Sequence, residues 1–117
     1  MVLEQEKSLR LDIEQTAEAA VVRFKGSAGM NEAEKIRSEL VALAESRVQM
    51  IVLDLAEMDF ICSAGLGAII YAHLKSRHHN GQIRLVRPQA AVMKLLETTR
   101  LTKLFPIFQD IKRAVRT

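Results

Sequence analysis

The segment from residue 59 to residue 67 holds the residues of this chain that are best suited to chemistry. It reads Asp-Phe-Ile-Cys-Ser-Ala-Gly-Leu-Gly, and it lies between a dense apolar stretch at residues 50–55 and an amphipathic stretch at residues 66–79. A short apolar run bounded by polar residues predicts a buried strand, and the longer stretch predicts a helix. The order is therefore strand, tight polar turn and helix, and Ser63 is predicted to be the N-cap of the helix.

The chemistry that Ser63 could support is the binding or covalent acceptance of an anion. Little side-chain bulk shields its hydroxyl group, because its neighbours are Cys62, Ala64, Gly65 and Gly67. Unpaired backbone N–H groups and the positive end of the helix dipole meet at a helix N-terminus, and both favour negative charge. A phosphate could therefore be carried there without disrupting the fold. The alternative is that Ser63 only caps a helix, because serine caps are common.

Three catalytic or phosphate-binding patterns do not fit the spacing around Ser63. A cysteine-based phosphatase loop needs an arginine six residues after the cysteine, and Ala68 occupies that position after Cys62. A nucleotide P-loop needs a lysine and then serine or threonine directly after its last glycine, and Ala68 and Ile69 follow Gly67. A nucleophile elbow needs glycine two residues before and two residues after the nucleophile, and neither Cys62 nor Ser63 has both.

The remaining reactive side chains form no catalytic set. A helix N-terminus can activate a thiol, but no histidine lies close to Cys62 in sequence to act as its base. The main alternative is that Cys62 is a small packing residue. His73, His78 and His79 have no metal-ligand spacing with other donors. We therefore expect no enzymatic activity, no metal and no cofactor.

Length and composition predict one cytoplasmic domain. The 117 residues can bury a single core, and residues 1–7 are expected to form a loose N-terminal tail. Cys62 is the only cysteine, so no internal disulfide can form, which suits a reducing compartment. No apolar run approaches the roughly 20 residues that a membrane-spanning helix needs, and residues 1–7 have no signal-peptide core.

The charge is unevenly distributed along the chain. The formal net charge is +3, but residues 1–60 hold 12 acidic and 7 basic residues, whereas residues 61–117 hold 2 acidic and 10 basic residues. The basic half suggests nucleic acid as a partner. Its basic residues are scattered, however, and one tyrosine and four phenylalanines form no stacking platform. We expect a solvated basic face that meets an acidic protein, and no direct contact with nucleic acid.

Two antiparallel strands are predicted near the N-terminus. Residues 9–14 alternate apolar and charged side chains, as a half-buried strand does, and residues 20–25 are predicted to pair with them. Gly26 is expected to break the second strand, and residues 26–29 are expected to form a flexible loop. Asn31 is predicted to cap the first helix, with Glu34 as the second half of a capping box.

The rest of the chain alternates strands and helices. The predicted elements are a strand at residues 51–55, a helix from Ser63 to a C-cap at Asn80-Gly81, a strand at residues 82–86, a helix opened by Pro88, an edge strand at residues 104–108, and a basic helix capped by Asp110 and ending at Val115. Together they predict an α/β fold, a mixed and mostly central-parallel sheet of four to five strands flanked by about four helices.

The motif around Ser63 resembles the signature of STAS domains, the family of bacterial anti-sigma factor antagonists. The resemblance is carried by Cys62-Ser63-Ala64-Gly65-Leu66-Gly67 after a strand that ends in Asp54-Leu55. It covers roughly residues 8–117, including the order of the strands, the Gly26 loop and the late helix at Pro88.

The resemblance implies a protein-binding switch without catalysis of its own. In the family, the serine aligned with Ser63 is phosphorylated by an anti-sigma factor serine kinase, and a phosphatase resets the cycle. The unmodified domain binds that kinase and releases a sigma factor, whereas the phosphorylated domain lets the kinase go. The residues implied in partner binding are Cys62, Ser63, Ala64, Gly65, Leu66, Gly29 and Asn31.

Two positions depart from the family pattern, and they leave alternatives open. Cys62 stands where an aspartate often precedes the serine, and Gly29 ends a loop that often reads Gly-x-x-Asp. Both changes remove negative charge from the implied partner surface. One alternative is a STAS module of a transporter, or of a stress-signalling scaffold, without a sigma-factor partner. Another alternative is that the chain is a small enzyme that depends on Cys62.

Overall fold

The computed structural model describes residues 8–17 and 19–116, so the predicted N-terminal tail at residues 1–7 lies outside the described residues. The elements are β1 (Leu9–Gln15), β2 (Ala19–Ala28), a 3-10 turn (Met30–Glu32), α1 (Ala33–Glu45), β3 (Met50–Ile61), α2 (Ser63–Arg77), β4 (Gln82–Val86), α3 (Ala90–Thr98), a second 3-10 turn (Leu101–Lys103), β5 (Ile107–Phe108) and α4 (Ile111–Ala114).

The strands form one mixed sheet in the order β1-β2-β3-β4-β5. β1 pairs with β2 in the antiparallel sense, and the pairs β2–β3, β3–β4 and β4–β5 are parallel. Each parallel pair is joined by a crossover that contains a helix, as a parallel connection requires. The predicted α/β fold with a mixed, mostly parallel sheet is confirmed.

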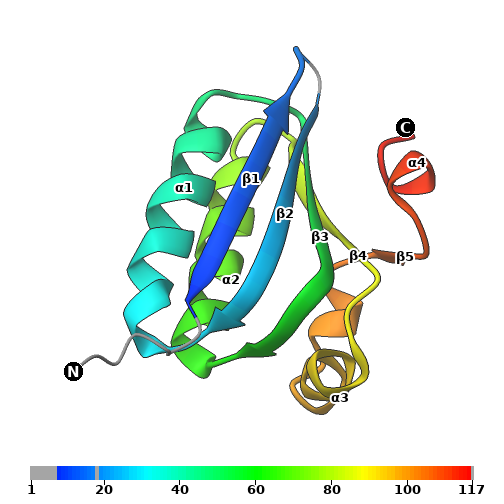
Figure 1. Ribbon diagram of the computed structural model, residues 1–117. Helices are drawn as coiled ribbons and strands as arrows, with labels where there is room; N and C mark the ends of the chain where they lie inside the picture. The colour runs from blue at the N-terminus through cyan, green and yellow to red at the C-terminus, as the bar shows by residue number, and fades with distance from the viewer. Residues whose placement is uncertain (1–7, 18, 117) are drawn as a thin grey trace.

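Helices cover the sheet on both sides. α1 and α2 lie side by side across one face of β1, β2 and β3, and α4 lies on the opposite side of the sheet (Figure 1). Ala114 of α4 is buried against Met50, Val52 and Val86 in a second, smaller apolar cluster. α3 lies close to the end of β3 that leads into α2.

The alternation of side chains explains which face of the sheet each helix covers. In β2, Ala20, Val22 and Phe24 are fully buried beneath the two long helices, while Val21 and Arg23 between them stay partly exposed. β3 differs, because every residue from Met50 to Leu55 is buried. A strand covered on both faces needs a nearly continuous apolar run, which is what the sequence shows there.

The predicted break in β2 is wrong. β2 continues through Gly26 to Ala28, which is fully buried, with register shifts against β3 on both sides of Gly26. Gly26 has φ +119°, and an added Cβ would run into the carbonyl oxygen of Ser8. Glycine is therefore required for a bulge that lets the strand bend and continue, and no flexible loop forms there.

Several predicted element ends are also wrong. Asn31 lies inside the first 3-10 turn and Glu32 is the N-cap of α1. Pro88 precedes α3, whose N-cap is Gln89, and only Ile107–Phe108 of the predicted edge strand is paired. The predicted end of α2 is wrong as well, because its C-cap is His78 and not Asn80-Gly81. The N-cap of the last helix agrees with the prediction. Asp110 caps α4 by accepting a hydrogen bond from the backbone N–H of Arg113 at 2.8 Å.

Candidate functional site

The turn before α2 consists of one residue, Cys62. β3 continues to Ile61, so residues 59–61 belong to the strand and not to the predicted polar turn. The N–H of Cys62 donates to the carbonyl oxygen of Ala28 at 2.9 Å, which ties the turn to the end of β2. The carbonyl oxygen of Cys62 accepts from the N–H of Leu66 at 3.0 Å, the first bond of the helix.

Cys62, and not Ser63, is the N-cap of α2. Cys62 has extended dihedral angles, φ −85° and ψ 170°, and it forms no side-chain cap bond with any described residue. Ser63 is the first helical residue, and its side chain is exposed. The N-cap prediction is therefore wrong by one residue. The shift releases the Ser63 hydroxyl group from a capping role and leaves it at the surface.

The geometry around Ser63 can receive an anion. The N–H groups of Ser63, Ala64 and Gly65 precede the first intrahelical bond, so they have no acceptor within α2. α2 is 15 residues long, and its dipole places partial positive charge at this end. A phosphate on the Ser63 oxygen would lie next to that charge. No acidic residue occurs in the first turn of α2 to compete with it.

Gly65 and Leu66 attach the start of α2 to the core by packing against it. Both are buried, and a Cβ added to Gly65 would lie 2.8 Å from Cγ1 of Ile61 and 3.5 Å from Cδ1 of Ile36. Small size at position 65 therefore lets α2 approach β3 and α1 closely. The role of Gly65 and Leu66 in partner binding stays a prediction, and it would have to act through this packing.

The end of β2 lies beside the Ser63 turn. β2 pairs with β3 up to Ala28 and Ile61, and Gly29 then leads into the 3-10 turn, which packs against α2. Gly29 is half-buried and Asn31 is exposed. Both predicted partner-binding residues are thus at the same end of the sheet as Cys62 and Ser63.

Sequence reasoning missed two exposed hydrophobic side chains in this region. Met30 is 71% exposed in the 3-10 turn, and Phe60 is 51% exposed near the end of β3. The usable signal was position, because Met30 directly follows one segment that was predicted to be a loop and Phe60 lies inside the other predicted turn. Their neighbour Asp59 accepts a hydrogen bond from the hydroxyl group of Ser27, which joins β2 and β3 just before the turn.

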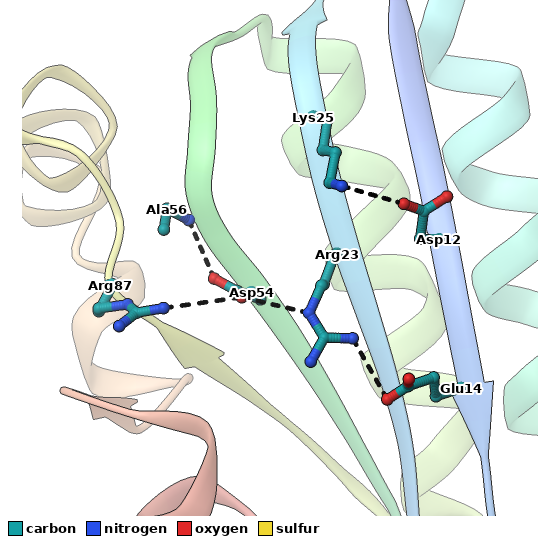
Figure 2. A network of polar contacts seen from close by, with 7 residues as sticks. All are labelled: Asp12, Glu14, Arg23, Lys25, Asp54, Ala56 and Arg87. Atoms are coloured by element: carbon teal, nitrogen blue, oxygen red, sulfur yellow. Dashed lines mark hydrogen bonds and ion pairs between the residues drawn. The ribbon is translucent and has the colours of Figure 1, made fainter.

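A polar network braces β3 on the face opposite α1 and α2 (Figure 2). Asp54 is nearly buried, and its carboxylate accepts from the backbone N–H of Ala56 at 3.1 Å. The carboxylate also lies 3.8 Å from Nε of Arg23 and 3.9 Å from Nη2 of Arg87. Arg23 in turn contacts Glu14 of β1 at 3.3 Å. The two guanidinium groups offset the cost of burying the Asp54 charge and connect β1 to the end of β4.

Two further ion pairs, both of them to Asp12, lie on β1 and β2. Asp12 lies 3.0 Å from Nε of Arg10 and 3.2 Å from Nζ of Lys25. Hydrogen bonds from Arg10 and Lys25 hold the pKa of Asp12 below its ordinary value. Because Asp12 is in contact with solvent, these two ion pairs contribute little to stability.

His73 lies on α2, ten residues beyond Ser63, and His78 and His79 follow the end of that helix. His73 is buried, its ring meets Phe105 edge-on at a centroid distance of 5.1 Å, and its Nδ1 accepts from the N–H of Ile83 at 3.4 Å. Burial, with a smaller contribution from Arg77, holds the pKa of His73 below its ordinary value. Within the described residues, no group of three His, Cys, Asp or Glu side chains is placed to hold a metal ion.

Comparison with known proteins shows what the chain as a whole resembles. The family model of the STAS domain matches residues 10–114. BtrV of Bordetella bronchiseptica, a proposed anti-sigma factor antagonist, is 24% identical over 99 residues, which are 85% of each chain. Among the described residues, no helix is both long and apolar enough to cross a membrane.

Solved structures share the fold. An anti-sigma factor antagonist from Mycobacterium paratuberculosis has a TM-score of 0.82 at 23% identity, with 92% of each chain covered. The Bacillus cell fate determinant SpoIIAA in its phosphorylated form has a TM-score of 0.70 at 18% identity, over 91% of this chain and 96% of that one. At such low identity these structures show only that the fold is shared. The assignment to a family therefore depends on the match to the family model. The chain belongs to the STAS domain family.

Proposed function

We propose that this protein is an anti-sigma factor antagonist whose partner binding is switched off by phosphorylation of Ser63. One observation carries the proposal. Ser63 is exposed at the first position of α2, free of a capping role and next to backbone N–H groups without an acceptor in the helix. A hydroxyl group that is accessible to a kinase and adjacent to an anion-stabilising helix end suits a reversible phosphate switch.

The partner is an anti-sigma factor serine kinase. In the transfer step, the oxygen of Ser63 forms a bond to the γ-phosphorus of ATP while the bond between that phosphorus and the β–γ bridging oxygen breaks. ADP leaves, and the hydroxyl proton passes to a base on the kinase. A phosphatase hydrolyses the phosphoserine and returns the domain to its binding state. The domain itself supplies the acceptor and no catalytic group.

The phosphate acts at the interface and not through the fold. A phosphoserine carries about −1.5 to −2 charges at neutral pH. The α2 dipole and the free N–H groups hold that charge locally, so the domain keeps its structure. A partner surface that fits the neutral turn of Cys62, Ser63 and Ala64 would instead bury an unpaired dianion, a cost of several kcal/mol. Binding is therefore lost by repulsion and desolvation.

The test is phosphorylation of the purified chain by its cognate kinase and ATP, followed by intact-mass and fragment spectra. One phosphate should be found on Ser63 and should be absent from Ser63→Ala. Ser27→Ala is the matched control, because Ser27 is at the same end of the sheet and should leave modification unchanged. Phosphate found only at another residue contradicts the proposal.

The spectra of the modified domain test the mechanism separately. Amide shifts should be confined to the neighbourhood of Ser63, while affinity for the kinase falls by orders of magnitude. Changes spread across the whole sheet, or an unchanged affinity, contradict the local mechanism. A chain that is never phosphorylated and binds no sigma-factor regulator would instead favour the module of a transporter or scaffold. Turnover of a small molecule by the purified chain alone, lost when the Cys62 thiol is blocked, would favour the enzyme.

A further inference from the structure

Two hydrophobic side chains flank the proposed phosphorylation site without being covered by the fold. Met30 and Phe60 are 71% and 51% exposed, whereas the apolar residues next to them, Ala28 and Ile61, are buried. The β2–β3 register pairs Ser27 with Phe60 and Ala28 with Ile61. Met30 therefore follows the end of β2, and Phe60 lies just before the end of β3, at the end of the sheet where α2 and Ser63 begin.

Phe60 also forms one wall of a groove. A hollow of about 200 Å³ lies between the end of β3 and the side of α3. Its lining is mostly apolar, and the residues that form it are Asp59, Phe60, Ile61, Ala91, Val92 and Leu95. The hollow is large enough to take one or two apolar side chains from outside, and Phe60 is exposed at its rim. Exposed apolar residues that stand alone are ordinary in proteins, but an aromatic beside an apolar groove is typical of interfaces.

The positions of Met30 and Phe60 relative to Ser63 indicate which partner protein would cover them. A kinase that transfers phosphate to Ser63 must enclose this turn, and a standard protein interface covers about 800 Å² on each partner. Phe60 is three residues before Ser63, and Met30 belongs to the 3-10 turn that packs against α2. Both side chains thus fall inside an interface centred on Ser63. Aromatic and methionine side chains are enriched there, and aromatic ones often carry much of the binding energy.

The polar composition of the site points the same way. Cys62 and Gly29, which lie on either side of the site, are uncharged, so neither can form an ionic contact with a partner. Asp59 is hydrogen-bonded to Ser27. Asp59 in the groove lining and Glu32 beside Met30 are the charged residues of this region, and the side chains between them and Ser63 offer apolar contact.

We propose that Phe60 and Met30 anchor the Ser63-modifying kinase, by packing against an apolar surface whose side chains enter the groove between β3 and α3. The inference rests on the proposed function, because it takes that kinase as the occupant. The inference adds two points to the proposed function. It names the residues that anchor the kinase, and it assigns the kinase an apolar contact surface in place of a basic one.

The experiment measures binding of the purified kinase, identified by its transfer of phosphate to Ser63, to the full chain in the presence of ADP. The variants are Phe60→Ser, Phe60→Leu and Met30→Ser, with Leu74→Ser as control. Leu74 is 55% exposed, like Phe60, but it lies eleven residues beyond Ser63 on α2, about 16 Å along the helix. Thermal unfolding of each variant checks that the fold is kept.

Phe60→Ser and Met30→Ser should each weaken binding by about tenfold or more, as loss of an interface anchor does, with a smaller loss for Phe60→Leu and none for Leu74→Ser. Affinity of the unaltered chain should change little between low and high salt. Wild-type affinity in Phe60→Ser, equal losses in Leu74→Ser, or a steep loss of affinity with salt would each overturn the inference. None of these results touches the proposed function, which fails instead if no kinase modifies Ser63.

A measurement on the wild-type chain provides an independent test of the same inference. Hydrogen exchange of the wild-type chain with and without the kinase should show protection at the end of β3 and along α3, in addition to the Ser63 turn. Protection limited to α1 and the distal half of α2 would contradict the proposed anchors.

Discussion

Gly65 and Ile61 are in contact so close that position 65 cannot hold a larger residue without movement. A Cβ added to Gly65 would lie 2.8 Å from Cγ1 of Ile61, the last residue of β3. Gly67 is two residues further along the same motif and is exposed, and a Cβ added there would meet no described heavy atom within 4 Å. The two glycines of one sequence motif therefore have different physical roles.

The first prediction follows from that difference. Gly65→Ala should lower the free energy of unfolding by about 1–2 kcal/mol, because overpacking costs more than the gain in helix propensity. Gly67→Ala should raise it by up to about 1 kcal/mol, because alanine is the better helix former and has room. Urea unfolding of both variants measures the two values, and equal effects at both positions would contradict the packing analysis.

The second prediction concerns Ser63. Because Cys62 is the N-cap, the Ser63 hydroxyl group does not hold the helix end, and Ser63→Ala should change the free energy of unfolding by no more than about 0.5 kcal/mol. The variant should keep partner binding and resist inactivation by the kinase and ATP. Thermal unfolding and a binding titration check both points. A large fall in melting temperature would make Ser63 a structural residue.

The third prediction is a pH dependence from His73. The folded state holds its pKa below the ordinary value of 6.5, chiefly by burial. Above that pH the ring is neutral in both states and its contribution to stability is complete. As the pH falls below it, the unfolded chain binds the proton first, so stability decreases until the folded-state pKa is reached. Protonation of Nδ1 would also remove the acceptor for the N–H of Ile83.

Melting temperature measured across this range checks the prediction. His73→Asn should flatten the decrease on the acid side, whatever its effect on the absolute stability. His78→Asn is the matched control, because it makes the same change at an exposed histidine near the end of α2. An unaltered slope in His73→Asn would show that other groups cause the acid sensitivity.

The fourth prediction concerns a buried hydroxyl group. Ser76 on α2 is fully buried, and its Oγ has no hydrogen-bond partner among the described residues. An unsatisfied buried polar group costs about 1–3 kcal/mol. Ser76→Ala should therefore leave stability unchanged or raise it by about 1 kcal/mol. Chemical unfolding measures this, and a clear loss of stability would reveal a hydrogen bond that the hydroxyl group makes in solution.

The motif around Ser63 shows how much of the local structure could be predicted from the neighbouring residues alone. The apolar run before it and the amphipathic stretch after it predicted the strand and the helix correctly, and the small residues predicted close packing. The boundary was wrong by one residue at the cap, because Cys62 accepts the first helical bond through its backbone and any residue type can do so. A side chain suited to capping is thus only a weak guide to where a helix begins.

By itself, the sequence determined the order of the elements, the α/β class and the exposed serine at a helix start, because apolar periodicity and turn residues act over a few neighbouring positions. Only the tertiary structure decided that Gly26 continues β2 through a bulge, and that Asp54 is paired with Arg23 and Arg87. It also placed Met30 and Phe60 at the same end of the sheet as Ser63. These features depend on which residues far apart in the chain become neighbours, and strand register and packing set that, not local preference.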